Sequence, residues 1–166
     1  MKPVEFYFDY ICPFCYRSFQ DLLELKKEKN DLVIDFHPCE IHPRPERHGK
    51  HSDLCIQGMF LAKDLGVDLW EYNQKIFHSH FVDRINIEEI QELANAIKEL
   101  IEPDLFLKEI SSGKYADTLK NTNTVAFSQH KIEVVPHYIS EHSVLPSVEG
   151  IGISKKNLDD FIRVLL

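Results

Sequence analysis

The sequence FDYICPFCYRSF at residues 8–19 places Cys12 and Cys15 at the end of an apolar run with two residues between them. A CxxC pair permits three interpretations: a redox-active dithiol, half of a zinc site, or two small buried residues. The structure expected on either side of the pair separates these interpretations.

The residues around the pair predict a strand, a helix and a second strand. Val4 to Phe8 is rich in β-branched and aromatic residues, and Leu32 to Phe36 (LVIDF) has the same character. Between them Phe19, Leu22 and Leu25 line one face of a predicted helix. The pair therefore lies where the first strand of a βαβ unit passes into its helix.

The middle of the chain, from about residue 52 to residue 112, carries helical signals only. Ser52, Asp68 and Asn86 are its predicted N-caps, and Pro103 opens a short helix. The most regular amphipathic pattern follows the Asn86 cap and consists of Ile87, Ile90, Leu93, Ile97 and Ile101.

The last third of the chain mixes helix and strand signals. Residues 114–130 predict a helix, and Val134 to Ile139 predicts a strand that contains Pro136. Because proline donates no hydrogen bond to a sheet, Pro136 marks the first residue of the strand or a cis turn. Val144 to Val148 is a candidate hairpin partner, and a final helix begins after Ser154. This order of elements predicts one α/β domain interrupted by a helical insertion.

The composition, with 43% hydrophobic and 28% charged residues, fits a globular protein, and no apolar run approaches the ~18 residues of a membrane span. The net charge of −8, from 19 basic and 27 acidic residues, argues against a nucleic-acid partner. The N-terminal MKPVEFYFDY does not have the pattern of a secretion signal, so we expect a cytoplasmic protein. In that reducing compartment four cysteines are expected to be free, catalytic or metal-bound.

The chemistry of the pair depends on where the helix begins. A helix that starts at Pro13 makes Cys12 its N-cap, where free N–H groups and the helix dipole stabilise a thiolate. Cys12 is therefore the expected nucleophile, and Cys15, one turn further in, is the expected resolving thiol. Because Phe14 and Pro13 carry no charge, the helix terminus should set the pKa of Cys12. Asp9 opposes that effect if its carboxylate lies close.

A zinc site would need a second pair of ligands, from Cys39 with His37 or from Cys55 with His51. No second CxxC occurs, and cysteines inside a helix do not form the usual turn of a zinc knuckle, so we expect no metal. Cys39 and Cys55 are instead expected to be small packed residues. The alternative from another class of function is a peptide- or zinc-binding module that uses the site without turnover.

In order and spacing these segments resemble the DsbA-like branch of the thioredoxin superfamily, especially the cytoplasmic FrnE-type dithiol-disulfide oxidoreductases. The resemblance rests on FDYICPFCY (residues 8–16), FHP (36–38) and VVP (134–136), and it spans essentially the whole chain. It implies an α/β thioredoxin fold with an all-helical insertion, and a thiol-disulfide oxidoreductase or isomerase. The implied division is a thioredoxin-like domain at residues 1–45 and 114–166 with the insertion at residues 46–113.

The resemblance also implies roles for residues far from the pair. Pro136 would be cis and lie beside the sulfur of Cys12, while Val135 would offer its backbone to an extended substrate segment. The implied substrate-binding residues are Pro13, Phe14, Val135 and Pro136. His137 is a candidate modulator, because a protonated imidazole facing the dithiol would favour the thiolate.

A second branch of the superfamily, the 2-hydroxychromene-2-carboxylate isomerases and kappa-class glutathione transferases, shares the insertion but usually has serine at the reactive position. Both cysteines are present here, which favours dithiol exchange and keeps a glutathione-dependent transferase or isomerase as the alternative. We expect protein or small thiol and disulfide substrates, and neither a nucleic acid nor a membrane as partner. No cofactor is expected apart from the Cys12–Cys15 disulfide, with glutathione as a candidate co-substrate.

Overall fold

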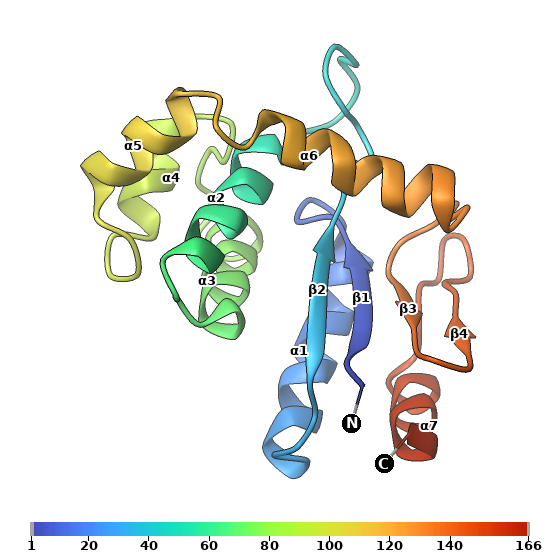
Figure 1. Ribbon diagram of the computed structural model, residues 1–166. Coiled ribbons are helices and arrows are strands. Elements are labelled where there is room, and N and C mark those ends of the chain that lie inside the picture. The colour runs from blue at the N-terminus through green and yellow to red at the C-terminus, as the bar shows by residue number, and fades with distance from the viewer. Residues whose placement is uncertain (1, 166) are drawn as a thin grey trace.

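The computed structural model describes residues 2–165 (Figure 1). Its elements follow in the order β1 (Val4–Phe8), α1 (Pro13–Glu28), β2 (Ile34–Pro38), α2 (Asp53–Asp64), α3 (Leu69–Phe81), α4 (Ile90–Ala96), α5 (Pro103–Ser111), α6 (Ala116–Asn123), the π-helical η1 (Thr124–Gln129), β3 (His137–Ile139), β4 (Val144–Leu145) and α7 (Lys155–Leu165). The βαβ unit, the helical middle and the mixed final third appear where the sequence predicts them.

The sheet has the strand order β2-β1-β3-β4. Because β1 and β2 are parallel, they need a crossover connection, which α1 supplies. In contrast, β3 runs antiparallel to β1, with His137 opposite Tyr7. The end of β1 and the start of β3 therefore lie at the same end of the sheet, which is also where α1 begins.

The alternation along β1 divides its aromatic side chains between the two faces of the sheet. Phe6 stacks on Tyr138 with ring centroids 4.7 Å apart, and the Tyr138 hydroxyl lies 2.6 Å from that of Ser18 on α1. Tyr7 points to the other face, where its ring lies 4.7 Å from His37 and 5.4 Å from His130. Figure 1 shows α1 behind β1 and β2, and α6 across the top of the sheet.

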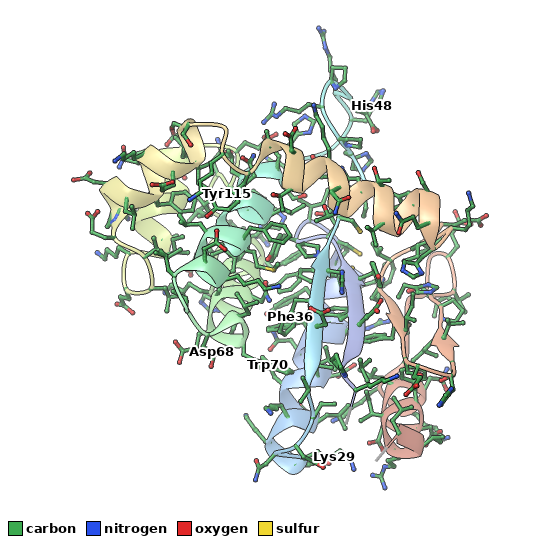
Figure 2. All side chains as sticks on the ribbon, viewed as in Figure 1. Lys29, Phe36, His48, Asp68, Trp70 and Tyr115 are labelled. Carbon is green, nitrogen blue, oxygen red and sulfur yellow. The ribbon has the colours of Figure 1, made fainter. Side chains whose placement is uncertain are left out.

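An aromatic layer joins the helices of residues 53–111 to α1 and β2. Phe19 of α1 lies 5.2 Å from Phe77 of α3, and Phe36 of β2 lies 5.2 Å from Trp70, also of α3. Figure 2 shows Phe36 and Trp70 next to one another between these elements. Full burial of a phenylalanine contributes roughly 1.5–3 kcal/mol, so this layer holds α3 firmly against α1.

The predicted helix that follows Asn86 is wrong at both ends, and α4 ends at Ala96, before Ile101 of the predicted pattern. The structure begins α4 at Ile90, with Glu89 as N-cap, and the Glu89 carboxylate accepts the N–H of Glu92 at 3.1 Å. The side-chain oxygen of Asn86 instead accepts the N–H of Glu88 at 3.1 Å. An asparagine that finds a partner two residues on forms a local turn rather than a helix cap. The apolar pattern is nevertheless buried at Ile87, Leu93, Ile97 and Ile101.

Other predicted boundaries are confirmed in part. Asp68 caps α3, with its carboxylate accepting the N–H of Trp70 at 2.8 Å, whereas the Ser52 side chain makes no cap hydrogen bond to α2. The second strand runs from Ile34 to Pro38, two residues later than predicted, and the helix predicted at residues 114–130 ends in the unpredicted π-helical turn η1. None of the helices within residues 2–165 has the length and apolar character needed to cross a membrane.

Candidate active site

Cys12 occupies the N-cap of α1 as predicted, with Pro13 at the start of the helix. Its sulfur accepts the backbone N–H of Cys15 at 3.3 Å. The same sulfur lies 3.8 Å from the carbonyl oxygen of Val135, 123 positions later in the chain. Cys12 keeps 7% of its surface exposed. The meeting of α1 with the start of β3 thus leaves one nearly buried sulfur at the junction.

Hydrogen bonding gives Cys12 a lowered pKa. The largest influence is the hydrogen bond from the Cys15 thiol. The backbone N–H groups of Cys15 and Phe14 act in the same direction, while burial and the charge of Asp9 oppose them. Because the lowering influences prevail, Cys12 forms a thiolate at a lower pH than an ordinary cysteine does.

Cys15 has the opposite character. It is 0% exposed, and burial raises the pKa of its thiol well above the ordinary value. The hydrogen bond to Cys12 raises the Cys15 pKa further, because it holds the proton on the Cys15 sulfur. Two thiols in one helical turn therefore differ as dithiol exchange requires: Cys12 ionises readily and Cys15 keeps its proton.

Asp9 is a fully buried carboxyl group just before the pair. One of its oxygens accepts the N–H of Ile41 at 2.7 Å, and the other accepts the N–H of Ile11 at 3.3 Å. Burial raises the pKa of Asp9 itself, and its charge raises the pKa of both Cys12 and Cys15. The opposing effect expected of a nearby Asp9 carboxylate is therefore present.

Of the predicted substrate-binding residues, Val135 and Pro136 are buried, and the peptide bond between them is cis, as the resemblance implies. Pro13 is exposed and Phe14 is half-buried. The Val135 carbonyl group contacts the Cys12 sulfur. Pro13 and Phe14 follow Cys12 directly in the first turn of α1.

The loop before α7 forms a wall beside Phe14. This wall was not predicted from the sequence. Gly152 has φ +82°, and a Cβ atom there would lie 3.0 Å from the Cβ of Phe14. Arg17 lies over the Phe14 ring at 5.4 Å and donates a hydrogen bond to the carbonyl oxygen of Ile151 at 2.6 Å. The only sequence signal for this close approach is the pair of glycines around Ile151.

His137 is the first residue of β3 and lies on the opposite face of the sheet from Tyr138. Burial lowers its pKa, and His130 lowers it further. His137 is not among the groups that shift the pKa of Cys12. Its influence on the dithiol stays a prediction.

Cys39 and Cys55 are both free and 0% exposed. The Cys39 sulfur lies 3.5 Å from the carbonyl oxygen of Phe8, and burial raises the pKa of both thiols. Both therefore lie in packed surroundings, as expected. Within residues 2–165 no group of three or more His, Cys, Asp or Glu side chains is arranged to hold a metal ion.

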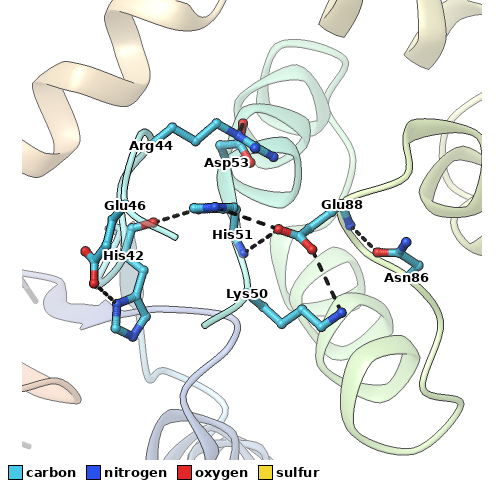
Figure 3. Close-up of polar contacts among 8 residues, drawn as sticks. All are labelled: His42, Arg44, Glu46, Lys50, His51, Asp53, Asn86 and Glu88. Atoms are coloured by element: carbon cyan, nitrogen blue, oxygen red, sulfur yellow. Dashed lines mark hydrogen bonds and ion pairs between the residues drawn. The ribbon is translucent and has the colours of Figure 1, made fainter. Parts of the chain in front are cut away.

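A polar network secures the loop between β2 and α2 (Figure 3). The imidazole of His51 lies 2.9 Å from the carbonyl oxygen of His42, and the backbone N–H of His51 donates to Glu88 at 3.1 Å. Lys50 reaches the same carboxylate at 3.8 Å. These contacts tie the loop to the segment before α4, and they were not predicted from the sequence because Glu88 is 37 positions from His51.

The chain is similar over nearly its whole length to proteins of known sequence and structure. A family model, the DSBA-like thioredoxin domain, matches residues 3–152. The Bacillus subtilis (strain 168) protein YwbO is 23% identical in an alignment of 193 positions that covers 95% of this chain and 96% of YwbO.

Two solved structures show the shared fold. The cytosolic disulfide reductase DsbM from Pseudomonas aeruginosa with GSH has a TM-score of 0.75 at 15% identity, over 99% of this chain and 98% of that chain. A 2-hydroxychromene-2-carboxylate isomerase has a TM-score of 0.69 at 18% identity, over 99% of this chain and 94% of that chain. With a thioredoxin fold, an all-helical segment between β2 and α6, and a family model that includes Cys12 and Cys15, the chain belongs to the DSBA-like thioredoxin domain family.

Proposed function

We propose that this chain is a thiol-disulfide oxidoreductase in which Cys12 attacks and Cys15 resolves. The observation that carries the proposal is the contrast within one helical turn. The sulfur of Cys12 receives an N–H at 3.3 Å and has a lowered pKa, whereas Cys15 is fully buried and has a raised one. Membership of the family supports the general kind of chemistry.

The reaction with a disulfide RSSR proceeds in two exchanges. The Cys12 thiolate attacks one substrate sulfur, so that a Cys12–SR bond forms, the RS–SR bond breaks, and RS⁻ leaves and takes a proton from water. Cys15 then attacks the Cys12 sulfur, and its proton passes to the second departing RS⁻. The products are a Cys12–Cys15 disulfide and two RSH, so the protein loses the two electrons that the substrate gains. The reverse order of steps donates the disulfide to a dithiol.

The substrate is placed against Pro13, Phe14, Val135 and Pro136. The Val135 carbonyl lies 3.8 Å from the attacking sulfur, next to any group attached to Cys12. An extended substrate segment can run along the Val135 backbone there, with Phe14 as the apolar neighbour on the helix side. The half-buried Phe14 ring supports this placement, because it is held between Gly152 and Arg17.

The likeness to DsbM supports a proposal for the cellular compartment and the co-substrate of the reaction. DsbM is a cytosolic disulfide reductase whose structure contains GSH. We accordingly propose a cytoplasmic enzyme that acts on protein or small disulfides and uses glutathione as co-substrate. The dithiol itself is the only redox centre that this proposal requires.

Trapping of the mixed disulfide tests the roles of the two thiols. With Cys15→Ser, exposure to a small disulfide should leave a stable adduct on Cys12, measured as one added thiol mass by intact mass spectrometry. Cys12→Ser should give no adduct, and the wild-type chain should pass on to the internal disulfide with no added mass. An adduct on Cys12→Ser together with none on Cys15→Ser would reverse the assignment.

A further inference from the structure

A small hollow of about 200 Å³ lies beside the start of β3, between the segment that follows η1 and the segment that follows β4. Ligand pockets usually measure roughly 300–1,000 Å³, so this hollow is small for a whole ligand and suits a single side chain. Residues 131–134, His137, Pro146 and Ser147 line it, and it is here called the β3 hollow.

The β3 hollow lies next to the nucleophile. Val134 lines the hollow, and the carbonyl oxygen of the following residue, Val135, lies 3.8 Å from the Cys12 sulfur. From the opposite wall, the Ser147 hydroxyl donates a hydrogen bond to the carbonyl oxygen of Pro136. Residues two apart in an extended chain are roughly 7 Å apart. A polypeptide bonded to Cys12 through its own cysteine can therefore bring a nearby side chain to Val134.

One part of the lining is apolar. Ile132, Val134 and Pro146 contribute aliphatic side chains. The position of Ile132 is fixed, because its N–H donates to the carbonyl oxygen of Ala126 in η1 at 3.1 Å. The apolar surface of the hollow is thus held in place by the backbone of the protein itself.

The polar part of the lining carries no net charge. Burial and the charge of His130 lower the pKa of His137, so its imidazole is neutral near pH 7. Lys131 and Glu133 are exposed and opposite in charge, and within residues 2–165 neither of them forms an ion pair. A charged side chain would lose hydration in the hollow and meet no net opposite charge, so an uncharged side chain is favoured.

We propose that the β3 hollow binds an apolar side chain of an extended polypeptide, one or two residues from the cysteine whose sulfur reacts with Cys12. This inference rests on the proposed function and names the substrate class. The Val135 backbone lies along the bound segment, and the hollow beside Val134 selects one of its side chains. A glutathione disulfide has no apolar side chain to place there, so the hollow distinguishes a polypeptide from a small disulfide.

Single-turnover rates with peptide disulfides test the proposal. Each probe is a short peptide with blocked ends and one cysteine bonded to 2-nitro-5-thiobenzoate. Leucine stands at one of the two positions before or after the cysteine, and glycine stands elsewhere. The reduced wild-type chain becomes the Cys12–Cys15 disulfide and releases the peptide thiol and the coloured thiobenzoate. Leucine at the position that meets the hollow should raise the rate about tenfold over the all-glycine peptide, the effect of removing about one aliphatic side chain from water.

Val134→Phe should fill the hollow and bring the ratio of the leucine rate to the glycine rate to about one. Val144→Phe is the matched control. Val144 pairs with Ile139 at the far end of β3 and is 58% exposed, so the added ring points into solvent and the ratio should stay at the wild-type value. Val134→Ala tests the hollow in the other direction if Val134→Phe does not fold. The larger hollow should raise the rate with phenylalanine relative to leucine about fourfold, as roughly one more buried CH₂ group would.

Three results would overturn the hollow as a substrate site: equal rates with the leucine and glycine peptides, a leucine preference that persists in Val134→Phe, or a faster reaction with lysine or glutamate in place of leucine. Failure of the wild-type chain to release thiobenzoate from any peptide would instead contradict the proposed function. Peptides with serine in place of cysteine then decide on the hollow alone. The leucine form should shift the NMR signals of His137 more than the glycine form does, and equal shifts would contradict binding there.

Discussion

The turns that lead into α1 and α4 both begin a helix, but they are held in different ways. Before α1, the Cys12 sulfur lies against Val135, 123 positions away in the chain. Before α4, three exposed side-chain hydrogen bonds within residues 86–92 form the turn. Glu88 adds contacts to Lys50 and His51 of the loop before α2. The first turn is fixed by the fold around it, and the second is fixed mainly by its own side chains.

This difference shows where a reactive group can be placed. The N–H donors that stabilise a thiolate at Cys12 come from the first turn of α1 itself, but a fixed neighbour requires backbone from a distant part of the chain. The turn into α1 has that neighbour, the Val135 carbonyl, because β3 runs antiparallel to β1. The capping oxygens of the turn into α4 are exposed, so water can replace them. They can start a helix, but they do not hold a reactive group in a fixed position.

The largest expected effect comes from filling the space beside the turn into α1. Gly152→Ala would place a Cβ 3.0 Å from the Phe14 Cβ at a φ of +82°, and neither atom can rotate away. We expect a loss of roughly 3 kcal/mol in the free energy of unfolding of the reduced protein, from strain and overpacking together. Denaturant titration measures this loss.

Gly150→Ala is the control for that prediction. Gly150 has a similar φ of +75°, but a Cβ there meets nothing within 4 Å. Only the strain of the left-handed backbone should remain, which lowers the free energy of unfolding by roughly 1 kcal/mol. Equal losses at the two glycines would show that the wall beside Phe14 is not closely packed.

Removing the buried charge before α1 should change the reactivity of the dithiol. The Asp9 carboxylate raises the pKa of Cys12, so Asp9→Asn should lower that pKa further. The pH midpoint of Cys12 alkylation by iodoacetamide should therefore shift downward. Asp21→Asn, which changes a carboxyl group further along α1 that is not among the groups acting on Cys12, should leave the midpoint in place. A midpoint that rises in Asp9→Asn would mean that Asp9 acts on Cys12 mainly through positioning.

The lowered pKa of Cys12 also predicts how stability depends on pH. An acid whose pKa is lowered on folding adds stability above its unfolded pKa, and this stability is lost as the pH falls through the folded pKa. The reduced wild-type protein should thus gain stability over Cys12→Ser as the pH rises through this window. The other three thiols have raised pKa values, so below the ordinary thiol pKa they keep their protons in the folded and the unfolded protein and add little to the difference in this window. A difference that does not change with pH would contradict the thiolate at Cys12.

The smallest effects are expected at the turn into α4. Glu89→Ala removes the N-cap acceptor for Glu92 and should lower the free energy of unfolding by about 1 kcal/mol. Asn86→Ala should cost about 0.5 kcal/mol, because it removes only one exposed hydrogen bond to Glu88. If Asn86→Ala were the more costly change, the cap predicted from the sequence would be the true one.

The sequence predicted the fold correctly where neighbouring residues allow only one local structure. Cys12 followed by Pro13 caps and opens α1 as expected, because a proline at the first helical position leaves no competing hydrogen bond. Asn86 shows the opposite case. Its side chain can cap a helix or close a turn, and the residues on either side did not distinguish these outcomes.

Of the candidate site, only Cys12 and Cys15 were predicted from the residues themselves. The resemblance added Pro136 in the cis form and Val135 beside the sulfur. The wall at Gly152 and the stack of Phe81 on Tyr16 were not predicted, because each joins residues that are far apart in the chain. No spacing rule connects such positions before the strand order is known.

By itself the sequence determined that a nucleophilic cysteine stands at a helix N-terminus, since a cap is made by residues within one turn of each other. It also determined the helical character of residues 53–111 through the period of the apolar residues, even where a boundary was misplaced. Only the tertiary structure places the Val135 carbonyl and the buried Asp9 around the thiolate. The physical reason is that these contacts depend on the antiparallel pairing of β3 with β1, which brings distant parts of the chain together.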